Sequence, residues 1–213
     1  MIEQNFMEKL LDGVKVERRI LGEISEIYGG LTGKNKSDFE DGNAYYISYK
    51  NIFDNIEINL KKLESVKVSS TENQNEVRYG DVLFTGSSET ANEVGMSSAV
   101  TSKIKEKIYL NSFSFGVRFN NDIKLLPEFS KYLFRSNFMR IEISKTAGGV
   151  TRFNLSKARF RKILIPIPPI HVQEEIVRIL DTFTELTAEL TARKKQYNYY
   201  RNMLLSFPKE EDK

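Results

Sequence analysis

The chain has 213 residues, of which 40% are hydrophobic, 29% are charged and none is cysteine. This length and composition are sufficient for the core of one or two domains and exclude a disordered chain. The absence of cysteine excludes disulfides, thiolate metal sites and cysteine nucleophiles, and it favours a cytoplasmic location. The first residues lack the basic-then-apolar order of a signal peptide, and no apolar run approaches the roughly 20 residues of a membrane span.

Positive charge is concentrated in one stretch, although the net charge of the whole chain is only +3. Between Lys131 and Lys162, nine basic residues stand against a single acidic residue, Glu142, which gives this stretch a net charge of +8. Such a basic block indicates either a surface that binds a polyanion or a solvated face that is balanced elsewhere. The aromatic residues within it have spacings that favour core positions over base-stacking positions.

Helix and strand signals follow one another along the chain. The pattern over Phe6–Leu11 predicts a short helix that ends at Gly13, a residue able to take the positive φ of a last turn. A region rich in β-branched and aromatic residues comes next, and helical spacing returns over Glu128–Ser144. The expected strands lie within Ala44–Tyr49, Val77–Thr85, Ser97–Ser102 and Phe113–Phe119.

The last part of the chain changes character at Ile163–Ile170, where three prolines in four residues exclude a helix and predict an extended strand or linker. From His171 to about Leu205, 35 residues contain no glycine or proline, which predicts a helix of roughly 52 Å. Apolar residues recur in it at alternating spacings of three and four, as in the seam of a coiled coil, with Arg193 as the exception. The seam residues are Ile176, Ile179, Phe183, Leu186, Leu190, Tyr197, Tyr200 and Leu204.

Two kinds of partner are open for this helix, which can pack on its own domain or pair with a helix of another chain. A domain of ~165 residues has a radius of gyration near 15 Å, so a rod of this length would protrude beyond it. We therefore expect an α+β architecture with a coiled coil. Its parts would be a mixed, β-rich globular domain over residues 1–165, a proline-rich junction and long helix over 166–207, and a charged tail over 208–213.

No catalytic constellation is evident in the sequence. His171 is the single histidine, which excludes a metal site built on several imidazoles and weighs against a histidine-based triad. The glycine pairs Gly29–Gly30 and Gly148–Gly149 lack the lysine and the strand-turn-helix setting of a phosphate-binding loop. The acidic-x-lysine pattern of metal-dependent nucleases occurs only at Glu211–Lys213, in the charged tail. We expect no catalytic activity and no metal.

Several segments, taken together, resemble the specificity (S) subunits of type I restriction-modification systems, and they follow one another in the family's order. The match is strongest at the junction Ile165–Ile170 and the first turns of the helix after it, which resemble the segment that opens the conserved helix of the family. The other matching segments are Leu21–Ile24 with Gly29–Gly30, Tyr79–Leu83, Gly148–Leu155, Gln173–Val177, Ile179–Asp181, Lys194–Tyr197, Tyr199–Arg201 and Leu204–Leu205.

The resemblance implies a function. Members of the family usually carry two target-recognition domains and two long helices, and each domain reads one half of a bipartite site in double-stranded DNA. This chain has one of each, which implies either a half-length subunit that forms an antiparallel homodimer and reads a palindromic interrupted site, or an excised half of a longer protein. Methyltransferase (M) and restriction (R) subunits would assemble with it. S-adenosylmethionine, Mg and ATP are expected on those partners, with no cofactor on this chain.

Loops are where we expect the DNA contacts, because arginine, lysine, asparagine, glutamate and serine side chains can pair with base edges. Three residues of the basic block, Arg159, Arg161 and Lys162, are expected to hold phosphates instead. The candidate DNA-binding residues are Thr32, Lys34, Asn35, Lys36, Tyr49, Lys50, Asn51, Ser87, Ser88, Glu89, Arg152, Asn154, Arg159 and Arg161.

Two other functions stay open at this point. The chain could be a protein-interaction module on a coiled-coil stalk that binds no nucleic acid, or a fragment of a nuclease or of a single-chain restriction-methylation enzyme. The net charge of +8 between Lys131 and Lys162 favours DNA binding over the first alternative. The missing catalytic motifs weigh against the second.

Overall fold

The computed structural model describes residues 9–11 and 13–207, and contacts divide the chain into two compact units, Met1–Glu174 and Glu175–Lys213. Residues 9–11 are helical and Gly13 has a φ of +73°, as expected for the end of the first predicted helix. The beginning of that helix and the charged tail over residues 208–213, with its Glu211–Lys213 pattern, lie outside the described residues.

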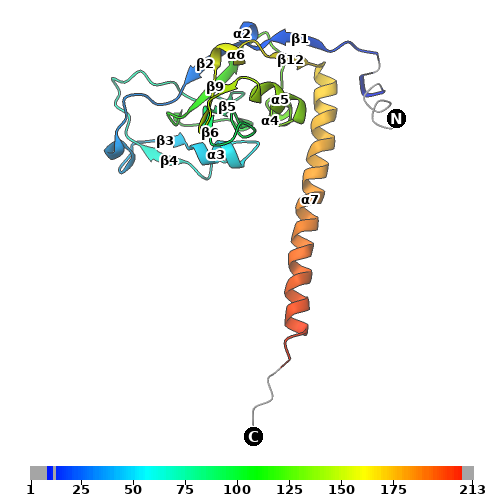
Figure 1. Cartoon of the computed structure of the whole chain (residues 1–213). Coiled ribbons are helices and arrows are strands. Elements are labelled where there is room, and N and C mark those ends of the chain that lie inside the picture. The colour runs from blue at the N-terminus through cyan, green and yellow to red at the C-terminus, as the bar shows by residue number, and fades with distance from the viewer. Residues whose placement is uncertain (1–8, 12, 208–213) are drawn as a thin grey trace. The chain divides into compact units, whose positions relative to one another are not determined.

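The first unit is built from short strands and helices around a central antiparallel sheet with the order β2-β9-β5-β7 (Figure 1). A second sheet has the order β4-β3-β8, in which β3 runs parallel to β8 and antiparallel to β4. The remaining strands form a sheet β10-β11-β6 and a pair β1-β12. The strands are β1 (Glu17–Ile20), β2 (Ser25–Gly29), β3 (Ala44–Ile47), β4 (Glu64–Val66), β5 (Val82–Thr85), β6 (Ser87–Ser88), β7 (Ser97–Ala99), β8 (Ile108–Leu110), β9 (Ser114–Phe119), β10 (Ala147–Gly148), β11 (Phe153–Leu155) and β12 (Leu164–Ile167).

Short helices connect these strands. Each of the four predicted strand regions contains a strand, with shorter bounds than the sequence indicates. The single helix expected over Glu128–Ser144 is wrong, because Ser136 takes an extended conformation and its side chain caps a new helix by accepting a hydrogen bond from the backbone N–H of Met139. Between residues 13 and 169 the helices are α2 (Leu21–Ile24), η1 (Lys36–Phe39), α3 (Tyr49–Asp54), α4 (Pro127–Leu133), α5 (Asn137–Ser144) and α6 (Lys157–Phe160).

Four phenylalanines form the centre of the core, and all are fully buried. The ring of Phe84 on β5 lies 5.5 Å from that of Phe115 on β9 and 5.0 Å from that of Phe160 at the end of α6. Phe134, just after α4, packs edge-on against Phe84 at 5.3 Å. Buried aromatic pairs at these separations add to the stability that area burial provides. This cluster thereby fixes α4 and α6 against the central sheet.

The corner before β5 is held by a buried carboxylate. Asp81, 1% exposed, accepts hydrogen bonds from the hydroxyl of Tyr28 at 2.6 Å and from the guanidinium of Arg118 at 2.9 and 2.7 Å. The backbone N–H of Arg78 donates to the same carboxylate at 2.8 Å. Burial, together with the charge of Asp81, raises the pKa of Tyr28, so this tyrosine stays a hydroxyl donor. The aspartate therefore joins β2, β5 and β9 around the corner.

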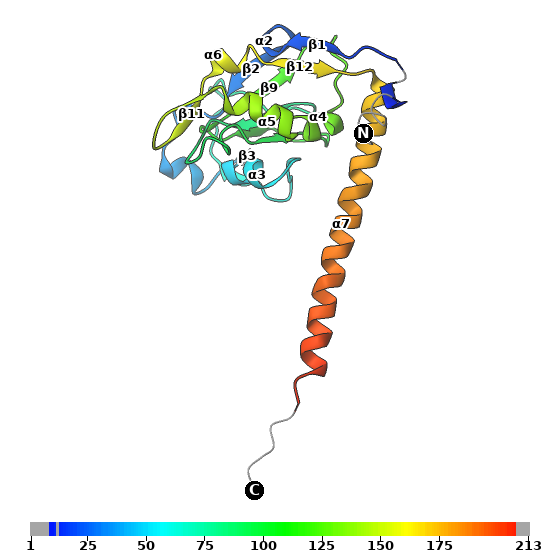
Figure 2. The same ribbon diagram turned by 45° about the vertical axis from the view of Figure 1, so that its right-hand side comes forward.

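The proline-rich junction belongs to the first unit. Its strand β12 pairs antiparallel with β1 along the edge of the unit, with Ile20 opposite Leu164 and Glu17 opposite Ile167 (Figure 2). Gln173, which is fully buried in the turn that follows, accepts a hydrogen bond from the backbone N–H of Leu126. Its amide nitrogen donates to the carbonyl oxygens of Lys124 and Pro168. For this reason the division falls after Glu174, later than the boundary at residue 165 that the sequence predicts.

The predicted long helix is confirmed as α7 (Ile170–Leu204), which begins in the first unit and continues through the second as 35 uninterrupted residues (Figure 1). Its seam side chains are uncovered over most of the second unit: Phe183 is 62% exposed, Leu190 55% and Leu204 69%. The coiled coil stays a prediction. No helix in the described part of the chain is both long and apolar enough to cross a membrane.

Candidate nucleic-acid interface

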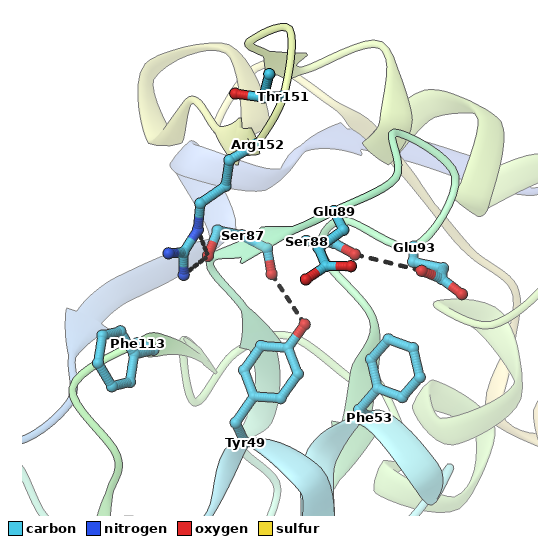
Figure 3. Close-up of a pocket in the computed structure, with 9 residues that line it drawn as sticks. All are labelled: Tyr49, Phe53, Ser87, Ser88, Glu89, Glu93, Phe113, Thr151 and Arg152. Atoms are coloured by element: carbon cyan, nitrogen blue, oxygen red, sulfur yellow. Dashed lines mark hydrogen bonds between the residues drawn. The ribbon is translucent and has the colours of Figure 1, made fainter.

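Loops and short strands of the first unit surround a pocket of about 920 Å³. Figure 3 shows its side chains, which come from four segments that are far apart in the sequence. We call it the loop pocket, and its residues are Tyr49, Phe53, Ser87, Ser88, Glu89, Glu93, Phe113, Thr151 and Arg152. Five of them are candidates from the sequence, so the fold brings Tyr49, Ser87, Ser88, Glu89 and Arg152 together.

Strand β6, which follows β5 after the single residue Gly86, contributes Ser87 and Ser88 to the loop pocket. The hydroxyl of Tyr49, on α3, donates a hydrogen bond to the carbonyl oxygen of Ser87 at 2.9 Å. The ring of Tyr49 also stacks on that of Phe53, with centroids 5.9 Å apart. These contacts hold β6 against α3, so the side of the pocket that carries Ser87 and Ser88 is supported by regular structure.

The hairpin β10-β11 supplies Arg152. Its strand β11 pairs with β6, with Asn154 opposite Ser87. The turn of the hairpin needs glycine at position 149, where φ is +134° and a Cβ atom would overlap the carbonyl oxygen of Arg152. The guanidinium of Arg152 donates to the hydroxyl of Ser87 from Nε at 3.3 Å and from Nη2 at 3.0 Å (Figure 3). Nη1 has no hydrogen-bond partner among the described residues, so donors of this guanidinium are available to a ligand.

Two glutamates place negative charge on the opposite side of the loop pocket. Glu93 accepts hydrogen bonds from the hydroxyls of Thr90 at 2.8 Å and Ser88 at 3.4 Å, which fixes its carboxylate within the loop. Glu89 is exposed and forms no hydrogen bond with the described residues. The pocket therefore presents a guanidinium, a free carboxylate and hydroxyls, which together can donate to and accept from the edges of bases.

The loop at residues 32–36 is bound to its own domain. Lys34 forms an ion pair with Glu72 and donates to the carbonyl oxygen of Lys67, and its side chain is only 6% exposed. The Lys34 ammonium, together with hydrogen bonds from the backbone N–H of Ser69 and the side chain of Gln74, lowers the pKa of Glu72 to about 2. Asn35 caps η1, of which Lys36 is the first residue, and the backbone of Thr32 exchanges hydrogen bonds with the side chain of Gln74. None of these four lines the loop pocket, and we remove Lys34 and Asn35 from the candidate DNA contacts.

The remaining candidates are dispersed. Asn51 is 4% exposed and its amide donates to the carbonyl oxygens of Asn59 and Lys62, so it is a structural residue and is removed from the candidate contacts. Its neighbour Lys50 is exposed on α3. The other candidates, all exposed and outside the loop pocket, are Asn154 on β11, Arg159 on α6 and Arg161 just after α6.

The basic block is only partly available to a polyanion. Arg135 donates to the backbone carbonyls of Ile52, Phe53, Asn55 and Ser97, and Arg140 to those of Asn92, Val94 and Gly95. Burial, together with the charge of Arg135, lowers the pKa of Arg140 to about 10. Lys131 is also buried and pairs with Glu57 at 3.5 Å. Three of the nine basic residues of this block therefore stabilise the fold and are not available to a polyanion.

Sequence reasoning missed four residues of the loop pocket: Phe53, Glu93, Phe113 and Thr151. Phe113 is the most informative omission, because a strand over Phe113–Phe119 would place it on the same face as the buried Phe115. In the structure the strand begins at Ser114, and Phe113 lies in the preceding turn with its ring 66% exposed. Asn111 and Ser112 just before it are turn-forming residues, and they are the one signal that could have revealed it.

The family of this chain follows from comparison of its sequence with known protein families. Residues 13–197 match the family described as the type I restriction modification DNA specificity domain. The chain belongs to this family. The match to this specificity domain covers the loop pocket and most of α7.

Relatives of this specificity domain agree with the assignment. The chain is 34% identical over 224 residues to the Escherichia coli type I restriction enzyme EcoR124I/EcoR124II specificity subunit, an alignment that covers 99% of this chain and 50% of the relative. A chain from a structure of a type I restriction-modification system matches with a TM-score of 0.60 at 19% identity, over 95% of this chain and 48% of that one. The HsdS subunit from Thermoanaerobacter tengcongensis matches with a TM-score of 0.56 at 17% identity, over 89% and 45%. The chain spans about half the length of the curated relatives it matches.

Proposed function

We propose that this specificity domain recognises one half of a bipartite site in double-stranded DNA for a type I restriction-modification complex, and that the loop pocket contacts the bases. The observation that carries the proposal is the convergence of five predicted residues, from three separate segments of the sequence, in one pocket of a family member. The pocket offers Arg152 for guanine O6 and N7, and Glu89 for the amino group of cytosine. The exposed Arg159 and Arg161 are assigned to phosphate contacts.

Arg152 provides the direct test. The recognised sequence is first selected from a pool of random duplexes with the purified chain, and the affinity of Arg152→Ala for that sequence is then measured. We expect a loss of about 1–3 kcal/mol, together with relaxed specificity at one base pair. The matched control is Arg178→Ala on α7, which removes an exposed arginine outside the pocket and should leave the affinity unchanged. Equal affinities of the native chain and Arg152→Ala would contradict the assignment.

The proposal includes a homodimer formed through α7. The seam is exposed over most of the second unit, and an isolated amphipathic helix gains most of its stability from packing of its apolar face. Charge along the helix is segregated: residues 170–190 hold five acidic residues and one basic residue, a net charge of −4, and residues 191–204 hold four basic residues and no acidic one, a net charge of +4. Antiparallel pairing places opposite charges together, whereas parallel pairing would place like charges together.

Light scattering and cross-linking test the dimer. The native chain should have twice the mass of one chain, Leu190→Glu in the seam should yield a monomer, and Ala188→Glu on another face of α7 should keep the dimer. Since the chain has no cysteine, Ile176→Cys and Tyr200→Cys each introduce a unique thiol. For an antiparallel pair, a short bis-maleimide should link a mixture of the two variants and neither variant alone. Linking of each variant to itself would contradict the antiparallel arrangement.

The chemistry of the complex is assigned to other subunits. In this proposal M subunits carry S-adenosylmethionine and methylate adenine, R subunits use Mg and ATP, and this chain is not catalytic. The relatives are themselves named specificity subunits, which supports this division. Incubation of the purified chain with DNA, magnesium and labelled S-adenosylmethionine should give neither methyl transfer nor cleavage. Turnover by the purified chain would contradict the proposal.

A further inference from the structure

Phe113 is the exposed phenylalanine of the loop pocket, whose other phenylalanine, Phe53, is partly buried on α3. At 66% exposure Phe113 is the most exposed aromatic side chain among residues 13–174. Single exposed hydrophobic residues are common on protein surfaces, so exposure alone carries no argument. The position of the Phe113 ring is informative, because the ring forms part of the wall of the loop pocket, which Arg152 and Glu89 also line (Figure 3).

The backbone of Phe113 is held on both sides. Its N–H donates to the side-chain oxygen of Asn111 at 3.0 Å, and its carbonyl oxygen accepts a hydrogen bond from Gly86 at 2.9 Å. Asn111 is itself buried, and its amide donates to the carbonyl oxygen of Ile47 at 3.0 Å. Glycine is needed at position 86, since a Cβ atom there would come within 2.7 Å of the Phe113 carbonyl oxygen. The exposed ring therefore projects from a support anchored in the core.

A fixed apolar surface beside hydrogen-bonding groups is suited to one feature of the DNA major groove. Among the base edges in that groove, the C5 methyl group of thymine is the apolar one, and phenylalanine is a side chain that contacts it. Insertion between stacked bases would require an apolar wedge that stands out from the protein surface. Phe113 instead lines a hollow and has about a third of its surface covered, which favours contact with a base edge.

We propose that Phe113 is a specificity-determining residue that contacts the C5 methyl group of a thymine. This inference rests on the DNA recognition proposed above. Arg152 and Glu89 supply polar contacts to neighbouring bases from the same pocket. The aromatic ring thus distinguishes thymine from cytosine and from uracil at one position of the half-site.

The test replaces each thymine of the selected recognition sequence, one at a time, with deoxyuridine, which lacks only the methyl group. At one position the native chain should bind the uracil duplex about fourfold more weakly, the effect of leaving one methyl group unburied. Phe113→Ala should bind the thymine and uracil duplexes equally at that position. Phe113→Leu, which keeps an apolar side chain, should retain part of the preference for thymine.

Tyr79→Ala is the matched control, because Tyr79 is an exposed aromatic residue (48%) outside the loop pocket and its removal should keep the preference for thymine. Unchanged urea midpoints would verify that the variants are folded. The proposal is overturned if no single uracil weakens binding of the native chain, or if Phe113→Ala loses affinity equally for both duplexes, as a wedge between bases would. A chain that selects no sequence at all would refute the proposed function itself, which separates the two failures.

Discussion

The two units differ in how their polar side chains are hydrogen-bonded and in how their apolar side chains are buried. In the first unit, polar groups bond across long stretches of sequence, as Asp81 does with Tyr28 and Arg118, and as Arg135 does with carbonyl groups of residues 52–55. In the second unit, side-chain hydrogen bonds such as Arg193 to Glu189 join residues four positions apart, and the apolar seam is exposed. The first unit is therefore stabilised by its own tertiary contacts, whereas the apolar seam of the helix is exposed in the described part of the chain.

Asp81 should give the largest effect if long-range polar contacts stabilise the first unit. Asp81→Ala removes a buried carboxylate and leaves the guanidinium of Arg118 and the hydroxyl of Tyr28 without their partner. We expect the free energy of unfolding to fall by about 3 kcal/mol, as for one partner removed from a buried ion pair. Urea denaturation measures this loss. A loss below about 1 kcal/mol, the value of an ordinary hydrogen bond, would show that the corner does not depend on its carboxylate.

The two units can also be compared by substituting a glutamine in each of them, Gln173 in the first unit and Gln196 in the second. Gln173→Ala leaves the backbone N–H of Leu126 and the carbonyl oxygens of Lys124 and Pro168 without their partner, so we expect a loss of about 1–3 kcal/mol. Gln196→Ala, on the exposed part of α7 in the second unit, is the matched control and should leave the urea midpoint unchanged. Equal effects of the two substitutions would contradict the difference between the units.

Substitution of Glu189 tests whether the side-chain ion pairs along α7 contribute little to stability. Its ion pair with Arg193 is 3.0 Å long, and both side chains are mostly exposed, at 59% and 73%. Glu189→Ala should reduce stability by no more than about 0.5 kcal/mol, the value of an exposed pair at this spacing on a helix. A larger loss that grows with protein concentration would mean that Glu189 binds a second chain.

The smallest effect on stability is expected for substitution of Lys34, whose ion pair with Glu72 lowers the pKa of that glutamate. Lys34 is the largest of the contacts that lower the pKa of Glu72 to about 2, so the stability from these contacts is present above the ordinary pKa of glutamate and is lost as the pH falls towards 2. In Lys34→Met the pKa of Glu72 should rise towards its ordinary value, as measured by NMR titration of the carboxyl carbon. An unchanged pKa would show that Lys34 is not bound to Glu72 in solution.

Part of the candidate site was predictable because some residue types are informative wherever they lie. Arginine, glutamate and serine in loops after glycine indicate ligand contacts, and Arg152, Ser87, Ser88 and Glu89 are indeed gathered in the loop pocket. The same chemistry misassigned Lys34 and Asn51, because a lysine or an asparagine in a loop can equally bond to its own domain. In both cases the partners lie outside the predicted site, with Glu72 some forty residues away from Lys34.

The sequence by itself determined the features that depend on neighbouring residues. These are the uninterrupted helix after the prolines, its heptad spacing of apolar residues, the regions of four strands and the family motifs, because propensity and periodicity are encoded locally. Only the tertiary structure decided which charges of the basic block are buried, that Asp81 and Gln173 hold their parts of the fold together, and that Phe113 faces a pocket. Burial and hydrogen-bond partnership depend on residues distant along the chain, and a local pattern does not contain that information.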